Sequence, residues 1–368
     1  MKKKILILVV SMLACSGCGT TNHEANPVSS IQDAEKESEM KGTQTSEGQS
    51  SSGDEATIEV FAMDTYITIK AYGKNANKAV AQAQERVEEL DKQLSTGLAE
   101  SEVSQLNAKG GGALSEEATY LMKRSLEICE NTNGAFNPIM YPIMEAWGFT
   151  KKTYQVPEES LLQQLLTFTN IQKLTFDEQQ KTVTLGMQGM KLDFGGIAKG
   201  YTSAQIMDIF KESGVESGMV SLGGNVQVLG SKVDGTPWRV AIQNPNTEEA
   251  YLGVLEVTDK AVITSGGYER YFEEDGKVYH HIIDPATGYP AESGLDTVTI
   301  VSKDGTLADG LSTALFVMGY EKAEEYWKNH SESFDAILHT KDGQLYVTEG
   351  IADDFSSDFT YSIIKQAE

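Results

Sequence analysis

Cysteine is scarce in this chain of 368 residues, which contains only Cys15, Cys18 and Cys129. If an N-terminal segment is removed on export, Cys129 is the one cysteine left in the body of the protein. That excludes a disulfide framework and a thiolate metal site in the body of the protein. Because Cys129 continues the apolar pattern of Leu121 and Ile128, we expect it to be a small core residue.

Positive charge is also in short supply: 30 Lys and Arg residues stand against 54 Asp and Glu residues, a formal net charge of −24. Loss of Lys2, Lys3 and Lys4 with an export signal would take this charge to −27. A surface this acidic repels the phosphates of nucleic acids and of anionic lipid head groups. We therefore expect no nucleic-acid partner, and any membrane contact must come from a lipid.

The N-terminus lacks a hydrophobic run long enough to span a membrane. Its apolar run, Ile5 to Ala14, has only ten residues, whereas a bilayer core of ~30 Å needs about twice that number in a helix. The run follows Lys2 to Lys4 and precedes the small residues Ser16 and Gly17, a pattern typical of an export signal. We predict that residues 1–18 are such a signal.

Cys18 follows Ser16 and Gly17 directly after the apolar run, which resembles a bacterial lipoprotein cleavage site. At such a site the cysteine is lipidated and becomes the new N-terminus. We expect an extracytoplasmic protein anchored to the cell membrane through a lipid on Cys18. Cys15 is an alternative lipidated residue, and plain secretion with cleavage nearby is the alternative to a lipid anchor.

Large apolar residues are almost absent between residues 19 and 55, where Ser, Thr, Gln, Glu and Gly dominate. Such a segment cannot bury enough surface to offset the entropy of ordering it, so we predict a flexible tether. Residues 56–365 then form the folded domain.

Within that domain, hydrophobic periodicity predicts both strands and helices. The stretch Thr57 to Gly73 alternates in the manner of two strands joined by a bend at Met63 to Thr65. The region Met219 to Val301 is rich in short β-branched runs and predicts a meandering, largely antiparallel sheet. Its order with the other elements favours an α+β fold. The other predicted elements are helices at Ala76–Leu94, Ser115–Thr132, Ala198–Ser213 and Leu307–Met318, and strands that include Trp238–Gln243, Val262–Thr264, Val278–Ile283, Ala336–His339 and Leu345–Thr348.

The segment Asp193 to Tyr201, with the sequence DFGGIAKGY, predicts a strand end, a glycine turn and a helix start. Backbone amides and the positive end of a helix at such a turn can hold phosphate oxygens. The segment is neither a P-loop, because it lacks Gly-Lys-Ser/Thr, nor part of a protein kinase, because no kinase catalytic loop accompanies it. An ordinary turn is the alternative.

Asp309 and Thr313 are four residues apart on a predicted helix, so they share one face, opposite the apolar stripe. A carboxylate and a hydroxyl there could bind one hard cation such as Mg²⁺, which usually also takes phosphate oxygens from a substrate. The alternative is a solvated helix face without a ligand.

His280 and His281 lie at the end of a predicted strand, before Asp284-Pro285. Adjacent strand residues point to opposite faces, so only one of the two histidines can serve a given site as a general base or phosphate partner. The alternative is a turn stabilised by Asp284 with two solvated imidazoles.

Together and in this order, five motifs resemble the ApbE family of flavin transferases, in its lipoprotein form, over essentially all of residues 56–365. The resemblance implies a T-fold-like α+β domain of mixed, largely antiparallel sheets packed with helices. The motifs are Asp193 to Tyr201, Ser221 to Asn225, Ser265 to Phe272, His281 to Gly288, and Ala308 to Thr313.

The resemblance implies a reaction at the pyrophosphate of FAD. A threonine hydroxyl of an exported or membrane redox protein attacks the FMN phosphorus, and AMP leaves. It further implies that Asp309, Thr313 and the backbone carbonyl of Gly196 bind Mg²⁺ or Mn²⁺, and that His281 is the general base. The residues implied to line the FAD site are Met63, Ala135, Phe136, Asn137, Asp193, Lys199 and Ile282.

The chain departs from the family pattern at two places. Asn137 stands where many relatives carry Asp, and Ser95-Thr96-Gly97 lacks the aromatic residue that often follows Ser-Thr and stacks on the flavin. Tyr141, Trp147 or Tyr201 could replace that ring, or could be core residues. Two other functions remain open: an FAD pyrophosphatase that uses water as nucleophile, and a flavin-binding lipoprotein without catalysis.

Overall fold

The computed structural model describes residues 55–247 and 250–366. The predicted export signal, Cys18 and the predicted tether up to residue 54 lie outside these residues. No helix in the described part of the chain is both long and apolar enough to cross a membrane.

The centre of the domain is a nine-stranded sheet in the order β1-β2-β6-β7-β10-β13-β14-β15-β17. All neighbouring strands are antiparallel except β15 and β17, so the predicted largely antiparallel sheet is confirmed. The strands are β1 (Glu55–Ala62), β2 (Thr65–Tyr72), β6 (Ser217–Leu222), β7 (Asn225–Leu229), β10 (Ala261–Gly266), β13 (Leu295–Ser302), β14 (Asp335–Thr340), β15 (Leu345–Thr348) and β17 (Ser362–Ile364).

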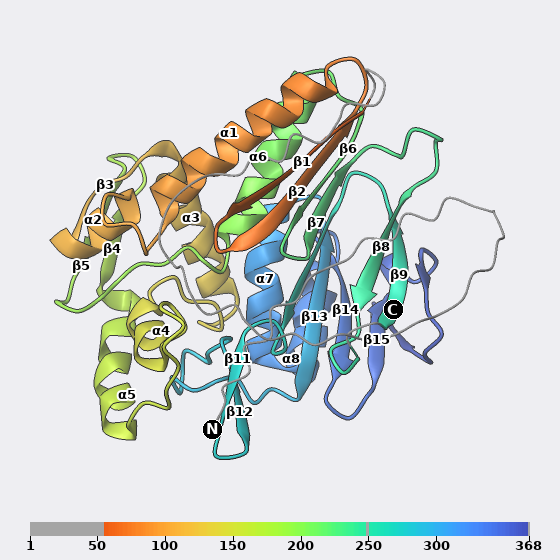
Figure 1. Ribbon diagram of the computed structural model, residues 1–368. Helices are drawn as coiled ribbons and strands as arrows, with labels where there is room; N and C mark the ends of the chain where they lie inside the picture. Colours follow the sequence, from red (N-terminus) through yellow and green to blue (C-terminus); the bar gives the residue numbers. More distant parts are fainter. Residues whose placement is uncertain (1–54, 248–249, 367–368) are drawn as a thin grey trace, which may run out of the picture. The chain divides into compact units, whose positions relative to one another are not determined.

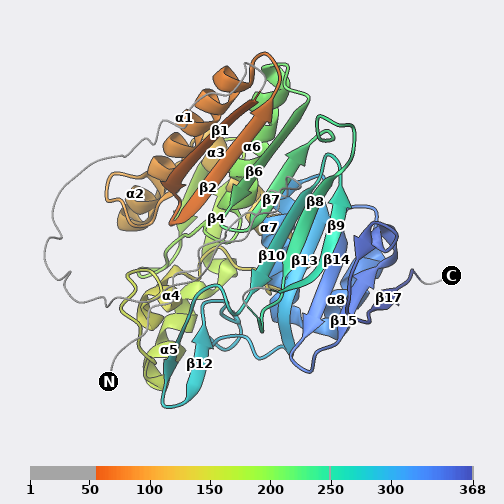
Figure 2. The same cartoon turned by 45° about the vertical axis from the view of Figure 1, so that its right-hand side comes forward.

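The two faces of this sheet are covered differently (Figures 1 and 2). Helices α1 (Ala76–Leu94), α6 (Ala198–Glu212), α7 (Gly305–Met318) and α8 (Tyr320–His330) pack on one face. The opposite face packs against a small sheet of β8 (Trp238–Gln243), β9 (Tyr251–Val257) and β16 (Phe355–Ser356) through a separate apolar cluster. Strand side chains alternate between these two environments.

A second group of elements lies beside the helical face and completes the site region. It contains a three-stranded sheet in the order β3-β5-β4 and a two-stranded hairpin, β11-β12. The elements are α2 (Glu102–Lys109), α3 (Glu116–Asn131), α4 (Tyr141–Trp147), α5 (Glu159–Leu166), β3 (Gly111–Ala113), β4 (Leu174–Asp177), β5 (Thr182–Leu185), β11 (Tyr271–Glu274) and β12 (Lys277–His280), with short 3₁₀ turns at Thr167–Thr169, Ile171–Lys173 and Glu349–Ile351.

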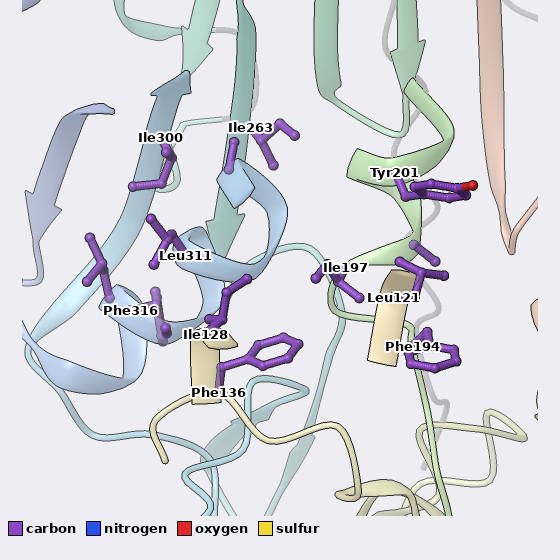
Figure 3. Close-up of a cluster of buried hydrophobic side chains, with 14 of the residues drawn as sticks. Leu121, Ile128, Phe136, Phe194, Ile197, Tyr201, Ile263, Ile300, Leu311 and Phe316 are labelled. Carbon is purple, nitrogen blue, oxygen red and sulfur yellow. The ribbon is translucent and has the colours of Figure 1, made fainter. Parts of the chain in front are cut away.

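The main hydrophobic core lies where α3, α6 and α7 converge above β10 and β13 (Figure 3). Leu121 and Ile128 of α3, Leu311 of α7 and Ile263 of β10 are all essentially inaccessible to solvent. Because the core joins the start of α6 to the middle of α7, it fixes the relative position of the two predicted phosphate and metal motifs. Cys129 is buried and free, as predicted.

Most of the predicted element boundaries agree with the structure, because capping and periodicity are local signals. Helix α1 has the predicted bounds, and Ser115 caps α3 by accepting a hydrogen bond from the Ala118 amide at 3.1 Å. Helix α7 begins two residues earlier than predicted, since the Asp304 side chain caps it. Helices α2, α4, α5 and α8 had not been predicted, and the strand end predicted at Asp193 is wrong, because the chain before the glycine turn is irregular.

One predicted strand was too long. The expected strand Val278–Ile283 ends at His280, and Ile283 forms only an isolated bridge with Pro290. The chain turns immediately afterwards because Asp284 accepts hydrogen bonds from the Ala286 amide with its side chain and from the Gly288 amide with its carbonyl, both at 2.8 Å.

Candidate active site

Asp309 of α7 is held at the start of α6. Its Oδ2 accepts a hydrogen bond from the Gly200 amide at 2.8 Å, and its Oδ1 accepts one from Asn225 Nδ2 at 3.1 Å. The side chain is buried, because apolar and polar neighbours surround α7 on nearly all sides. The alternative of a solvated helix face is therefore wrong for Asp309.

Burial raises the pKa of Asp309 above its ordinary value, because a charged carboxylate loses water there. The nearby Lys199 ammonium and the two hydrogen bonds act in the opposite direction. Desolvation outweighs these interactions, and a bound cation would compensate for the water that the carboxylate has lost.

Gly200 brings α6 against α7 more closely than any other residue type could. A Cβ atom at this position would lie 2.1 Å from the Gly305 carbonyl oxygen and 2.6 Å from Asp309 Cβ. In a regular helix the Gly200 amide would donate to the carbonyl of Gly196, four residues earlier. It donates to Asp309 instead, and no hydrogen-bond donor within the described residues reaches the Gly196 carbonyl.

Thr313, one turn after Asp309, faces the end of strand β10. Its hydroxyl lies 3.3 Å from Ser265 Oγ, which is also 2.8 Å from Ser312 Oγ. Thr313 is only partly buried. The structure thus brings Asp309 against the start of α6 and places Thr313 one turn further along the same face of α7, as the spacing of the two residues indicated.

These groups form a set of hard oxygen donors: one carboxylate, one hydroxyl and one unengaged carbonyl. Such a set fits Mg²⁺ or Mn²⁺, which keep waters and take few protein ligands. The described residues contain no cluster of three or more His, Cys, Asp or Glu side chains, so a site built from several acidic or thiolate side chains is not found there.

His281 lies directly after β12, and its neighbour His280 points away from it. The His281 ring is partly exposed, whereas His280 is buried against Phe316, with ring centroids 5.5 Å apart. The prediction that the two histidines occupy different environments is confirmed. The backbone carbonyl of Arg270 accepts a hydrogen bond from the His281 amide at 3.0 Å and lies 3.3 Å from His281 Nδ1.

A carbonyl oxygen carries no proton, so the contact with Arg270 requires Nδ1 of His281 to be the protonated nitrogen. Nε2 is then the unprotonated, basic atom. The pKa of His281 is well below 6.5, first because protein atoms replace water around the ring and then because Arg270, His280 and Lys199 contribute positive charge. The ring is therefore neutral near pH 7.

Two charged residues of this region had not been predicted as site residues. Glu269 and Arg270 are solvent-exposed; Glu269 lies within electrostatic reach of Lys199 and Asp309, and Arg270 lies within reach of His281. Both lie within the motif Ser265 to Phe272, shortly after the glycine-rich turn Gly266-Gly267, but no role had been assigned to either. A turn that ends in two adjacent charged residues was the available signal.

The predicted FAD-lining loop lies against the glycine turn before α6. The Asp193 amide donates to the Pro138 carbonyl at 2.8 Å, and Asp193 Oδ1 accepts from the Gly195 amide at 2.8 Å. A Cβ at Gly196 would lie 3.0 Å from the ring of Phe136. Ala135 is partly buried in the same cluster.

Asn137 has a structural function in this loop. Its Nδ2 donates to the Thr169 carbonyl at 2.9 Å, and its Oδ1 accepts from the Ile139 amide at 3.1 Å. Both ends of the side-chain amide are thus occupied, and the amide supplies a donor that an Asp at this position would lack.

Met63 occupies the two-residue turn between β1 and β2. Met63 and Asp64 have φ angles of 53° and 60°, as a tight hairpin turn requires. The Met63 amide donates to Asp91 Oδ1 at 3.0 Å, and Thr202 Oγ1 lies 3.4 Å from its sulfur, which places Met63 near the second turn of α6. Ile282 is buried among core residues.

Of the three aromatic residues considered for the missing flavin contact, Tyr141 is the one beside Thr96. Its hydroxyl donates to the Thr96 carbonyl at 3.4 Å. Trp147 is fully buried, and Tyr201 packs against Tyr120 with ring centroids 5.4 Å apart. Trp147 is thus a core residue.

The model that describes the ApbE family matches residues 63–338. The chain belongs to the ApbE family. Two curated relatives of this ApbE chain are FAD:protein FMN transferases. That of Treponema pallidum is 34% identical over 314 residues, which cover 80% of this chain and 86% of that protein. That of Klebsiella pneumoniae is 34% identical over 292 residues, which cover 78% and 89%.

Solved structures show the same fold. The ApbE protein of Thermotoga maritima aligns with a TM-score of 0.76 at 30% identity, covering 80% of this ApbE chain and 97% of that one. The flavin transferase ApbE from Vibrio cholerae aligns with a TM-score of 0.72 at 28% identity, covering 80% and 97%. The predictions of the family, of an α+β fold and of an enzyme of this kind are confirmed.

Proposed function

We propose that this chain transfers FMN from FAD to a threonine hydroxyl of an acceptor protein, with AMP as the leaving group. The observation that carries the proposal is the convergence of a buried carboxylate, Asp309, with the start of α6, Lys199 and the neutral ring of His281. The names of the curated relatives support flavin transfer as the reaction.

The start of α6 and Lys199 supply the binding of the FAD pyrophosphate. The backbone amides at this start that already have acceptors within the protein are those of Gly195, Ile197, Ala198 and Gly200. The attraction for phosphate oxygens would therefore come from the positive end of the α6 dipole and from the Lys199 ammonium near Asp309. Asp309, Thr313 and the Gly196 carbonyl would hold Mg²⁺ or Mn²⁺. When bound, that cation would neutralise charge on the pyrophosphate.

His281 accepts the proton of the attacking threonine. A bond forms between the threonine oxygen and the FMN phosphorus, and the bond from that phosphorus to the AMP oxygen breaks. The threonine proton passes to Nε2, because the Arg270 carbonyl keeps the proton of the neutral ring on Nδ1. The products are AMP and an acceptor that carries FMN through a phosphoester bond.

The test is incubation of the protein with FAD, Mg²⁺ and an exported flavoprotein that accepts FMN, followed by denaturing electrophoresis and flavin fluorescence. We expect a fluorescent acceptor band with wild type, and none with His281→Ala, Asp309→Ala or an acceptor whose threonine is replaced by alanine. AMP release at an equal rate with and without acceptor would instead identify an FAD pyrophosphatase. FAD binding without AMP release would identify a binding protein.

We also propose that the enzyme works outside the cytoplasm, held at the membrane by a lipid on Cys18, and that its acceptors are exported or membrane redox proteins. The support is the sequence pattern of residues 1–18 and the polar composition of the segment that follows. A tether of that composition lets the domain reach acceptors near the membrane surface.

A further inference from the structure

Two strands of the central sheet place polar side chains directly beneath the site. On β7, Asn225 and Gln227 are two residues apart and face α6 and α7, whereas Val228 faces the small sheet on the other side. On β10, Ser265 occupies the equivalent position facing α7. Asn225 and Gln227 are buried, and Ser265 is partly buried. Asn225, Gln227 and Ser265 take no direct part in the proposed FMN transfer.

Asn225 controls the orientation of the Asp309 carboxylate. Asn225 Nδ2 donates to Oδ1 at 3.1 Å while the Gly200 amide donates to Oδ2 at 2.8 Å, so each oxygen has one fixed donor. Two donors on the two oxygens determine the plane of the carboxylate. Each oxygen retains lone-pair capacity for a cation.

Ser265 controls the direction of the Thr313 hydroxyl. Ser312 Oγ donates to the Asp309 carbonyl at 2.8 Å, so its proton is used. In the 2.8 Å contact between Ser265 and Ser312, Ser265 must then be the donor. Ser265 has no second proton, so in its 3.3 Å contact with Thr313 the Thr313 hydroxyl donates, and the lone pairs of Thr313 are left free.

We infer that Asn225 and Ser265 are positioning residues that preset Asp309 and Thr313 as oxygen donors for a divalent cation. The inference rests on the proposed function for its metal ligands. A ligand whose oxygen is already oriented loses less entropy on binding a cation, and removal of such a support commonly weakens metal affinity by about 10- to 100-fold.

The test measures Mn²⁺ binding directly, by the electron paramagnetic resonance signal of free Mn²⁺, without flavin or acceptor. We expect Asn225→Ala and Ser265→Ala each to weaken Mn²⁺ binding by about tenfold or more. Ser265→Thr keeps the hydroxyl, which can still donate to Ser312 and accept from Thr313. Its Mn²⁺ affinity should therefore stay within about threefold of the wild-type value.

Matched controls are available on the same strands. Gln227→Ala removes a hydrogen bond to Ser203 on the same face of β7, and Thr264→Val removes one to Thr299 on β10. Both should lower the melting temperature about as much as the test variants, yet leave Mn²⁺ affinity within about twofold of wild type. Equal weakening by test and control variants would overturn the inference.

Mn²⁺ binding and FMN transfer, measured on the same variants, distinguish failure of the inference from failure of the proposed function. If Asp309→Ala abolishes Mn²⁺ binding but Asn225→Ala and Ser265→Ala bind as wild type does, the inference is wrong and the metal site stands. If Asp309→Ala binds Mn²⁺ as tightly as wild type does, both the inference and the proposed metal site are wrong. If no FMN transfer occurs but Mn²⁺ binding depends on all three residues, the inference stands without the transferase reaction.

Discussion

His280 and His281 are neighbours in the chain and both have a lowered pKa, but they differ in their access to solvent. Burial lowers the pKa of His280 to about 4, and His281 has a pKa well below 6.5 that keeps it neutral near pH 7. Only His281 combines a neutral ring with a partly exposed position beside Arg270 and Lys199. At the scale of single residues, the environment therefore decides which imidazole can act as a base.

This environment predicts the pH dependence of the reaction. Only neutral His281 can accept a proton, and its folded pKa lies below 6.5, so we expect the acidic fall in kcat/KM to have its midpoint below pH 6.5. The measurement is the initial rate of acceptor flavinylation from pH 5 to 8.

Protonation of Asp309, whose pKa is raised, would weaken metal binding at low pH and would lower kcat/KM in a similar way. The pH profile of kcat/KM is therefore measured at two Mg²⁺ concentrations. A fall caused by Asp309 moves to lower pH with more Mg²⁺, whereas one caused by His281 stays in place. If the midpoint of the fall in kcat/KM lies at or above pH 6.5 and does not change with the Mg²⁺ concentration, the assignment of His281 as the base is contradicted.

Gly200 is a second position where one residue controls the site. In Gly200→Ala, the new methyl group would lie 2.1 Å from the Gly305 carbonyl oxygen, so α6 and α7 must separate. We expect a loss of about 1–3 kcal/mol in the free energy of unfolding. FMN transfer should fall with it, because the Gly200 amide can no longer reach Asp309. Urea unfolding and the transfer assay measure the two effects.

Gly97→Ala is the control for stability, because its nearest non-neighbouring atom is Ser95 Oγ at 3.6 Å, an ordinary contact. We expect Gly97→Ala to change the free energy of unfolding by less than about 0.5 kcal/mol. Equal stability of the two alanine variants would show that the helices are not held as closely as described.

At the scale of elements, the β11-β12 hairpin carries Arg270 at its start and His281 at its end. Its inner face, Phe272 and Tyr279, packs on Trp147 of α4, with ring centroids 6.3 Å and 5.3 Å away. Trp147 Nε1 also donates to the Gly288 carbonyl at 2.8 Å. A two-stranded hairpin is marginally stable by itself, so these contacts hold it in place.

Trp147→Ala should therefore loosen the hairpin and displace His281. Truncation of a fully buried Trp costs about 3–5 kcal/mol, and we expect faster tryptic cleavage at Lys277 in the hairpin together with loss of FMN transfer. Limited proteolysis with mass spectrometry locates the cut. Trp238→Ala in β8, on the other side of the main sheet, is the control and should leave cleavage at Lys277 unchanged.

At the scale of the whole molecule, the folded domain and the segment before it have separate functions. Under the proposed function, the domain would carry the reaction and the N-terminal segment would set the location. The domain comprises the described residues, and it has the same fold as ApbE proteins over 80% of the chain. We therefore expect residues 56–368 to fold and transfer FMN without the preceding residues.

Lipidation of Cys18 is tested in cells that express the full chain with an alkyne-bearing fatty acid in the medium. We expect wild type and Cys15→Ala to incorporate the label and to sediment with membranes, and Cys18→Ala to do neither. The physical reason is that a hydrophobic run of ten residues is too short to anchor the protein by itself. Label that survives in Cys18→Ala but not in Cys15→Ala would move the anchor to Cys15.

The sequence by itself determined the elements whose signals are local. Helix α1 could be delimited because apolar residues repeat every three or four positions, and α3 because Ser115 is a capping residue. The motifs from Asp193 to Thr313 also sufficed to predict the family, since each motif is a short contiguous string. The length of β12 and the existence of α2, α4, α5 and α8 were missed because tertiary packing decides them.

Only the tertiary structure decided how the site is assembled. Gly200 and Asp309 are 109 positions apart in the chain, and Asn225 and Asp309 are 84 apart, so no periodicity connects them. Such contacts also determine the burial of Asp309 and the position of the proton on Nδ1 of His281. They likewise determine the direction of the hydrogen bonds that run from Thr313 through Ser265 to Ser312. The spacing of Asp309 and Thr313 indicated that they share a helix face, but the packing of α6 and α7 on strands β7 and β10 determined what that face binds.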